Sequence, residues 1–218
     1  GGMRIVIAGG HGQIALLLER RLADAGHEPV ALIRNPSHES DVVAAGAEPV
    51  LLDLESTDAD ALARVLAGAD AAVFAAGAGP GSTPERKGTV DRDASVLLAD
   101  AAVQAGVPRL VQVSAMSADR YEADSDDIFQ IYLRAKSEAD ARLRETSLEW
   151  TIVRPGRLTN EPATGAVTIG ESVSYGEIPR DDVAAVIAEL LVSGAGVHWQ
   201  FDLVSGDTPV GEAVGALR

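Results

Sequence analysis

The stretch Arg4-Ile5-Val6-Ile7-Ala8-Gly9-Gly10-His11-Gly12-Gln13-Ile14-Ala15 decides the fold of this 218-residue chain. Apolar, mostly β-branched residues run directly into glycines, and apolar side chains then recur at helical spacing until Gly26. This order predicts a strand, a tight turn and a helix. The small residues Gly9, Gly12 and Ala15 let the backbone approach a pyrophosphate while the amides at the helix N-terminus face the anion. The stretch therefore predicts a dinucleotide-binding turn, with a purely structural turn as the alternative.

The same alternation of strand and helix continues along the chain. Further buried strands are expected at 29–33, 50–52, 71–75, 110–113, 151–153 and 199–204, and the clearer helices at 58–66, 89–105, 128–145 and 181–191. The strands are continuously apolar, which is typical of a parallel sheet that is covered on both faces. We therefore expect an α/β fold in which residues 3–218 form a single NAD(P)-binding domain: a Rossmann-type, doubly wound, mostly parallel sheet in three layers.

Two stretches fall outside this alternation. Residues 155–179 have no clear period and are rich in Gly, Thr and Ser. An irregular segment of this length is typical of a functional loop, so we expect 155–180 to form a small C-terminal segment that covers the substrate. The acidic stretch 121–127 lies immediately before a predicted helix and is expected to be a solvated loop, with a mobile lid as the alternative.

Charge and composition exclude several classes of function. The 33 acidic and 18 basic residues give a formal net charge of -15, which repels nucleic-acid backbones and anionic membranes. The chain has no cysteine, which excludes disulfides and thiolate chemistry, and its four histidines leave little for a metal site. No apolar run is long enough to span a membrane. We therefore expect a cytoplasmic protein that acts on a small molecule, with no metal, no nucleic-acid partner and no membrane partner.

Residues after the next predicted strands bear on the choice of cofactor. NAD-binding proteins usually place an acidic residue after the second strand, whereas arginine suits the 2′-phosphate of NADP. This chain has Arg34 there, so we expect NADP rather than NAD; an exposed surface cation is the alternative. Asp53 follows the third strand, where its carboxylate or a neighbouring amide can bind adenine, and the small residues 75–77 allow close approach to the adenine ribose. His11 is expected to lie in the turn near the pyrophosphate.

Candidate catalytic residues lie on a predicted helix and after a predicted strand. Tyr132 and Lys136 are four residues apart and share one helix face. A nearby cation favours the phenolate, so the tyrosine can donate or accept a proton near neutral pH, and the lysine can also hold the nicotinamide ribose. An exposed helical pair is the alternative. Ser114, at the end of the fifth strand, is expected to orient a substrate carbonyl.

Taken together, these motifs resemble the short-chain dehydrogenase/reductase superfamily and, within it, the compact atypical NAD(P)H-binding group of the NAD-dependent epimerase/dehydratase-like type. The resemblance covers essentially the whole chain, and it implies that 155–158 line the nicotinamide end and that Asp91 stands where the superfamily carries asparagine. The residues expected to contact the cofactor are Gly9, His11, Gly12, Gln13, Ile14, Arg34, Asp53, Leu54, Ala75, Ala76, Gly77, Val113, Lys136, Pro155, Gly156, Arg157 and Leu158.

The chain also departs from the family pattern at two points. Ala115 stands where the family usually carries the second serine of a Ser-Ser pair, so Ser114 or Ser117 must substitute if that hydroxyl is used. Only 63 of the 218 residues follow Pro155, which is short for the larger substrate portion of nucleotide-sugar enzymes. A bulky nucleotide-sugar is therefore a poor fit.

The sequence as a whole predicts an NADP(H)-dependent oxidoreductase that acts on a small carbonyl or quinone. In this interpretation Tyr132 supplies a proton, Lys136 positions the ribose and tunes the phenol, and Ser114 orients the substrate. Two alternatives stay open. One is a non-catalytic NADP-binding redox sensor that acts through a protein partner, and the other is an NAD-dependent sugar epimerase or dehydratase.

Overall fold

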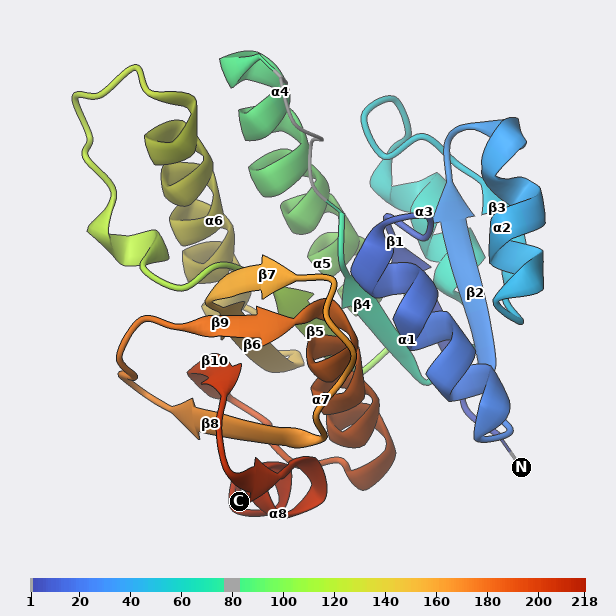
Figure 1. Ribbon diagram of the computed structural model, residues 1–218. Coiled ribbons are helices and arrows are strands. Elements are labelled where there is room, and N and C mark those ends of the chain that lie inside the picture. The colour runs from blue at the N-terminus through green and yellow to red at the C-terminus, as the bar shows by residue number, and fades with distance from the viewer. Residues whose placement is uncertain (1, 77–82) are drawn as a thin grey trace.

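The computed structural model describes residues 2–76 and 83–218, and a nine-stranded sheet runs through the centre of these residues (Figure 1). The order across the sheet is β11-β8-β10-β6-β5-β4-β1-β2-β3. The mutually parallel core strands are β1 (Arg4–Ala8), β2 (Glu28–Ile33), β3 (Glu48–Leu51), β4 (Ala71–Phe74), β5 (Arg109–Val113), β6 (Glu149–Pro155) and β10 (Trp199–Ser205). The order of β1 to β6 is that of a doubly wound Rossmann sheet, which confirms the expected fold class.

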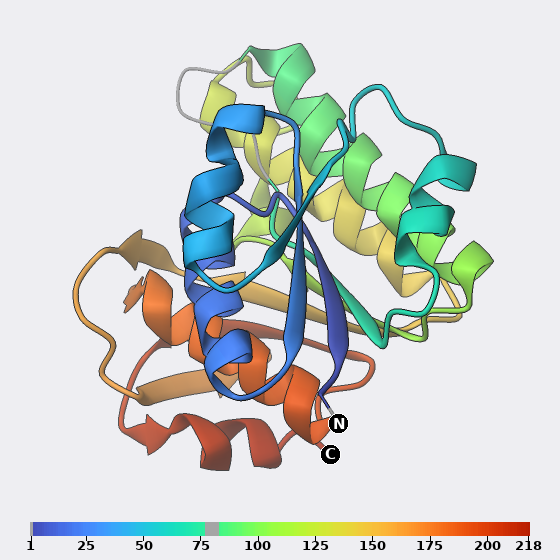
Figure 2. The same ribbon diagram turned by 90° about the vertical axis from the view of Figure 1, so that its right-hand side faces the viewer.

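Helices cover both faces of the sheet, as Figure 2 shows. One face carries α1 (Gln13–Asp24), α2 (Glu39–Ala44), α7 (Arg180–Ser193) and α8 (Val210–Gly215). The other carries α3 (Ala59–Leu66), α5 (Ala94–Ala105) and α6 (Ile128–Arg144). The short α4 (Pro84–Gly88) and a π-helical turn, η2 (Thr89–Asp93), lead into α5, and η1 (Pro36–His38) and η3 (Ala118–Arg120) are single 3-10 turns. Within the described residues, no helix combines the length and the apolar character needed to cross a membrane.

The first strand illustrates why continuous hydrophobicity gives a covered sheet. Successive side chains of a strand point to opposite faces. Ile5 and Ile7 are fully buried in the cluster that includes α1 and α7, whereas Val6 and Ala8 are fully buried in the cluster that includes α3 and α5. Both faces therefore exclude water, and each large aliphatic side chain contributes about 1.5–3 kcal/mol by its burial.

The prediction that residues 155–179 are irregular is wrong. The segment contains β7 (Arg157–Thr159), β8 (Ala166–Gly170) and β9 (Glu177–Pro179). β7 pairs with β9, while β8 pairs in an antiparallel direction with β10 and with the short β11 (Thr208–Pro209). These strands are short, and their partners are distant in sequence, so no local period indicates them.

Two buried carboxylates attach this segment to the rest of the fold. Asp182, in the first turn of α7, accepts hydrogen bonds from Thr164 N and Oγ1 and from Gly165 N. Asp202, on β10, accepts one from Val173 N. The segment therefore has a defined path along the edge of the sheet, because backbone groups at its turns are bonded to elements outside it.

A capping residue is expected to contribute measurably to the stability of α3. Asp58 Oδ1 accepts a hydrogen bond from Ala61 N at 2.8 Å, which satisfies one of the free amides at the helix N-terminus. Asp58→Ala should lower the free energy of unfolding by about 1 kcal/mol, or about 2–4 °C in Tm. Thermal unfolding measures this, with Asp58→Asn as the matched control because asparagine retains a capping oxygen. Equal losses in the two variants would contradict the capping role.

Candidate functional site

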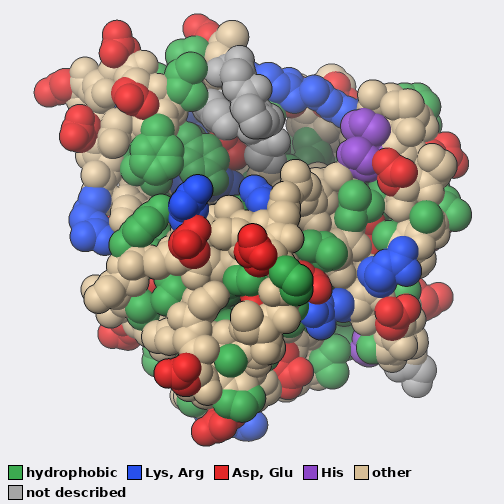
Figure 3. Space-filling view, viewed as in Figure 1, with side chains coloured by type: hydrophobic (Ala, Val, Ile, Leu, Met, Phe, Trp, Pro, Cys, Tyr) green, Lys and Arg blue, Asp and Glu red, His purple; other side chains and the backbone are tan. Residues whose placement is uncertain are grey.

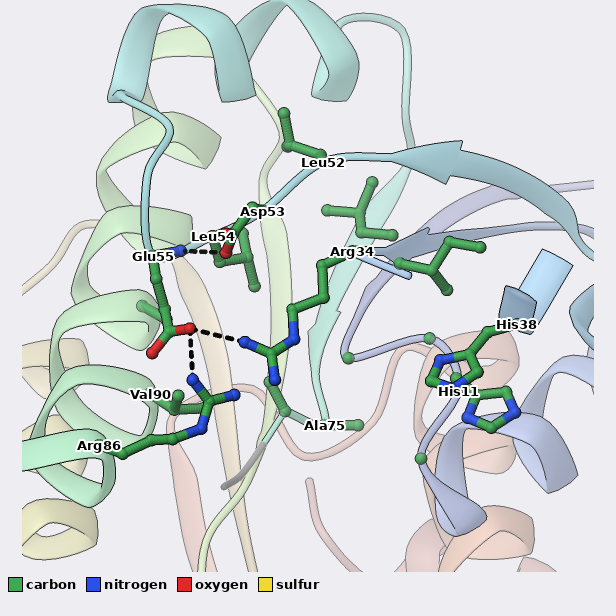
Figure 4. Close-up of a pocket in the computed structure, with 17 residues that line it drawn as sticks. His11, Arg34, His38, Leu52, Asp53, Leu54, Glu55, Ala75, Arg86 and Val90 are labelled. Carbon is green, nitrogen blue, oxygen red and sulfur yellow. Dashed lines mark hydrogen bonds and ion pairs between the residues drawn. The ribbon is translucent and has the colours of Figure 1, made fainter. Parts of the chain in front are cut away.

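A candidate site lies at the carboxyl ends of β1 and β4, where the order of the strands in the sheet reverses. Ligands of open α/β sheets bind at such a point. A cavity of about 400 Å³ opens there (Figure 4). It is lined by Gly9, Gly10, His11, Gly12, Leu32, Ile33, Arg34, His38, Leu52, Asp53, Leu54, Glu55, Ala75, Ala76, Arg86, Val90 and Ala94.

The glycine turn forms one wall of this cavity and fits an anion. Gly9 has a φ of +75°, and a Cβ there would lie 2.5 Å from the Cα of Ala76. A Cβ on Gly10 would lie 2.5 Å from that of Ala31, so both positions require glycine. Gly12 is the N-cap residue of α1 and has no side chain to cap it, and the first turn of α1 contains no acidic residue. Free amides and the positive end of the helix dipole therefore face the cavity, as a pyrophosphate requires.

Arg34 lies at the cavity as predicted, but it has an unpredicted carboxylate partner. Its Nη1 donates to Glu55 Oε2 at 2.8 Å, and Nη1 of Arg86 donates to the same oxygen at 2.6 Å (Figure 4). Glu55 follows β3 and Arg86 lies on α4, so three separate segments meet here. Sequence reasoning missed both residues, although Glu55 directly follows Asp53 and Leu54, which were expected to contact the cofactor.

Two histidines stack beside the glycine turn. The rings of His11 and His38 are 3.6 Å apart with an interplanar angle of 9°, and Figure 4 shows them at the side of the cavity away from Glu55. His11 Nε2 lies 2.8 Å from Asp41 Oδ2. His11 is therefore in the predicted turn, with its ring packed against η1 and bonded to a residue of α2.

The residues expected to contact adenine and its ribose also lie at the cavity. Asp53, Leu54, Ala75 and Ala76 all line it, whereas Gly77 lies outside the described residues. Asp53 Oδ1 accepts a hydrogen bond from Glu55 N at 2.9 Å. This carboxylate thus shapes the turn after β3 and orients the backbone that carries Glu55.

Tyr132 and Lys136 lie farther along the same sheet edge, on the face of α6 that packs against the sheet. Asp127 caps α6 by accepting from Phe129 N at 2.7 Å. The Lys136 side chain is only 4% exposed; its Nζ lies 3.4 Å from Asp91 Oδ1 and donates to Val113 O at 3.2 Å. The same Nζ lies 5.8 Å from the centroid of the Tyr132 ring. The alternative interpretation, in which Tyr132 and Lys136 form an exposed pair on the helix surface, is therefore wrong for Lys136.

Electrostatics at this pair differ from the prediction made for it. Burial raises the pKa of the Tyr132 phenol, and the nearby Lys136 cation lowers it by less, so the net direction is upward. The expectation that Lys136 brings the phenol pKa toward neutrality is wrong for this structure. Burial by itself lowers the pKa of Lys136, but the negative charges of the Asp91 and Asp140 carboxylates, and of Tyr132 in its phenolate form, together raise it by more. Tyr132 is therefore protonated and Lys136 cationic at neutral pH.

Ser114 has a different partner from the one expected. The residue is buried, and its hydroxyl donates to Asp140 Oδ2 at 2.5 Å. Asp140 also accepts from Gln112 Nε2 and from the Arg154 guanidinium, which reaches on to Asp119. The Ser114 hydroxyl therefore donates its hydrogen bond to a buried polar network, and its proton is not available for a hydrogen bond to a substrate.

The predicted nicotinamide end lies beside the β7–β9 pair. Met116 N donates to Pro155 O and Gly156 N donates to Leu203 O, so the turn after β6 is bonded to two neighbouring segments. A Cβ on Gly156 would lie 2.2 Å from Gly176 O, which requires glycine there. Arg157 Nη1 is exposed and lies 3.2 Å from Glu177.

The start of α6 exposes apolar surface near Tyr132. Phe129 is 60% exposed, and its ring stacks on that of Tyr132 with centroids 6.4 Å apart. Figure 3 shows acidic side chains gathered over the loop that precedes α6, which is the predicted acidic stretch 121–127. An apolar contact surface thus adjoins the phenol, with a negatively charged loop above it.

Comparisons with known proteins agree with this geometry. The family described as NAD(P)H-binding matches residues 9–193. A Bacillus subtilis protein named as an uncharacterized sugar epimerase, YhfK, is 36% identical over 216 residues, which cover 99% of this chain and 100% of that protein.

Solved structures of similar proteins cover the whole fold. A protein from Bacillus halodurans, provisionally named an NAD-dependent epimerase/dehydratase, is 35% identical with a TM-score of 0.90, covering 99% of this chain and 100% of that one. The oxidoreductase ylbE from Lactococcus lactis is 27% identical with a TM-score of 0.85, covering 99% of this chain and 96% of that one.

Proposed function

The chain belongs to the NAD(P)H-binding family, of the atypical short-chain dehydrogenase/reductase type, and from this premise we propose that it is an NADP(H)-dependent oxidoreductase of a small carbonyl or quinone. One observation supports the proposal most strongly. A protonated phenol, Tyr132, lies beside a buried cationic lysine, Lys136, at the sheet edge that also carries the dinucleotide-type cavity. A proton donor next to a cofactor site is the arrangement that carbonyl reduction needs.

The residues present fit a nicotinamide dinucleotide. The amides after Gly12 accommodate a pyrophosphate, the apolar residues Ala76 and Val90 accommodate adenine, and Arg34 accommodates a 2′-phosphate. When bound, such a cofactor supplies the hydride for reduction. The protein supplies position, charge and a proton.

Tyr132 is the proposed proton donor to the substrate oxygen, and Lys136 is the proposed ribose ligand. The Lys136 charge stabilises the phenolate that remains after the proton has been donated, because the opposite charges lie in a poorly hydrated site. Asp91 lies on the π-helical turn η2, and its carboxylate helps to keep Lys136 cationic. Val90, on the same turn, lines the cofactor cavity. This turn therefore connects the adenine end of the site with the catalytic end.

Apolar surface favours a flat or weakly polar substrate. The exposed Phe129 ring extends the apolar surface around Tyr132. The name of the Lactococcus lactis relative, an oxidoreductase, is in keeping with this proposal. The names of two other relatives point instead to epimerase chemistry, for which this chain has few residues after Pro155.

Cofactor oxidation by purified protein tests the proposal. NADPH and NADH are each supplied with a panel of quinones, aldehydes and ketones, and absorbance at the nicotinamide band is followed. We expect turnover with at least one acceptor and a preference for NADPH, because Arg34 offers a guanidinium group to its extra phosphate. Turnover with NADH alone would contradict the NADP assignment, and conversion of a nucleotide-sugar without net cofactor oxidation would favour the epimerase.

A second candidate function, a non-catalytic NADP(H) sensor, has one observation in its favour. Ser114 is committed to Asp140, and Ala115 supplies no hydroxyl, so these two positions offer no donor to orient a carbonyl. Loss of a donor of this kind lowers rates by about 10²–10³-fold. Tight NADPH binding with no turnover of any acceptor would favour the sensor.

A further inference from the structure

Two arginines from different parts of the chain converge on one carboxylate oxygen at the cavity. Arg34 Nη1 lies 2.8 Å and Arg86 Nη1 lies 2.6 Å from Glu55 Oε2. The side chain of Glu55 is only 22% exposed, whereas those of Arg34 and Arg86 are 53% and 32% exposed. One oxygen of this less exposed carboxylate thus accepts a hydrogen bond from both guanidinium groups, as Figure 4 shows.

The charges of this cluster do not cancel. The side chains of Arg34, Arg86 and Glu55 together carry a net charge of +1. Asp53, the second carboxylate that lines the cavity, accepts a hydrogen bond from the Glu55 amide and contributes one negative charge beside them. Each guanidinium has five N–H donors in a rigid fork, and the bond to Glu55 uses one donor of each. Guanidinium donors on both arginines therefore remain for an incoming anion.

The place that Glu55 occupies suits a phosphate better than a carboxylate. A phosphate monoester has about −1.5 to −2 charges at pH 7 and three acceptor oxygens, which two guanidinium forks can bind together. A phosphate and the Glu55 carboxylate repel each other at this distance, so both cannot lie between the arginines.

We propose that Arg86 and Arg34 together bind the 2′-phosphate of NADP(H), and that Glu55 is its internal competitor, holding both guanidinium groups in place until the phosphate displaces it. This inference rests on the NADP(H) dependence of the proposed function and identifies the residues that set it. Arg86 then determines the preference for NADP(H) over NAD(H). Glu55 lowers the affinity for NADP(H), because it competes with the 2′-phosphate for the two guanidinium groups.

The two substitutions have opposite expected effects on binding. Arg86→Ala should weaken NADPH binding by about 10–100-fold, the loss of one charge-assisted contact, and change NADH binding by less than about threefold. Glu55→Gln should tighten NADPH binding by about 3–30-fold, because the competing charge is removed, and leave NADH binding within about threefold. Arg86→Lys, which keeps the charge but not the fork, should fall between wild type and Arg86→Ala.

Dissociation constants measured by calorimetry test this without any turnover. NADPH and NADH are compared, and adenosine 2′,5′-bisphosphate is compared with 5′-AMP to isolate the 2′-phosphate. Arg142→Ala is the matched control, since it removes an exposed, ion-paired arginine that does not line the cavity. The control should bind all four compounds as wild type does.

The outcomes distinguish this inference from the proposed function. If Arg34→Ala weakens NADPH binding and Arg86→Ala does not, the role of Arg86 is overturned while the NADP preference stands. Equal losses for NADPH and NADH in Arg86→Ala would show that Arg86 only shapes the cavity. If wild type binds NADH as tightly as NADPH, or if Glu55→Gln weakens NADH binding by tenfold or more, the NADP assignment itself fails, because Glu55 then binds the ribose 2′-hydroxyl.

Discussion

Tyr132→Phe should lower turnover by about two to four orders of magnitude and leave the dissociation constant of NADPH within about threefold of wild type. The substitution removes one hydroxyl and keeps the ring, so the stack on Phe129 is preserved. The Lys136 ammonium, the proposed ribose ligand, stays beside Asp91 and Val113 O. The loss should therefore fall on the chemical step and not on cofactor binding.

Steady-state kinetics and a separate binding titration measure the two quantities. Tyr121→Phe is the matched control, because it removes the same hydroxyl from a tyrosine whose ring lies against Arg134. The control should retain turnover within about threefold. Unchanged turnover in Tyr132→Phe would overturn the assignment of Tyr132 as the proton donor.

The raised pKa of Tyr132 also predicts the shape of the pH profile. A proton donor must be protonated, and burial raises the pKa of this phenol above its ordinary value. Reduction should therefore show no alkaline decline from Tyr132 between about pH 6 and pH 9. A decline near neutrality that disappears in Tyr132→Phe would mean that Lys136 outweighs burial when cofactor is bound.

Glu19→Gln should stabilise the protein by about 3 kcal/mol at pH 7, which is the second large effect that the structure predicts. Glu19 lies on α1 between the buried residues Ala15 and Leu22 and is itself 0% exposed. Among residues 2–76 and 83–218, neither carboxyl oxygen has a hydrogen-bond partner. Burial without a partner raises the pKa of this carboxyl to about 9.

The sign of the pH dependence follows from this shift. Between the unfolded value of 4.5 and the folded value of about 9, the folded protein keeps a proton that the unfolded chain has lost. Stability from this group is therefore fully present below about pH 4.5 and falls as pH rises to about 9. Glutamine cannot ionise, so the advantage of Glu19→Gln should grow over that window and vanish in acid.

Chemical unfolding of wild type and Glu19→Gln at pH 4.5, 7 and 9 measures this difference. Glu171→Gln, in the exposed turn between β8 and β9, is the control and should change stability little at any of these pH values. Parallel stability curves for wild type and Glu19→Gln would mean that Glu19 is ionised and solvated in the folded protein.

Much of the fold could be predicted because its determinants are local. The turn at 9–12 can be predicted because its close backbone contacts require glycine. The buried strands can be predicted because each is a run of apolar residues. The helices that begin at Ala59, Ile128 and Arg180 follow from their spacing of apolar residues, and their bounds differ from the predicted ones by only a residue or two. The π-helical turn at Thr89–Asp93 was predicted as ordinary helix, since side-chain spacing hardly distinguishes the two.

The sequence could predict those residues of the candidate site whose role follows from their position within a single segment. Arg34 at the end of β2 and the pairing of Tyr132 with Lys136 on α6 follow from position and spacing. Glu55 and Arg86 could not be found in this way, because the contact between them depends on how the segments after β3 and β4 meet. Asp140 as the partner of Ser114 is a contact of the same kind.

By itself, the sequence determined the strand-turn-helix start, the parallel sheet and the place of the cofactor cavity, since backbone conformation and hydrophobic period depend on near neighbours. Only the tertiary structure decided that 155–179 forms strands, that Ser114 donates inward, that Glu55 lies between two arginines and that burial raises the pKa of Tyr132. These properties depend on hydrogen-bond partners, charges and excluded water contributed by residues far apart in the chain. They are therefore defined only when the sheet and its covering helices have assembled.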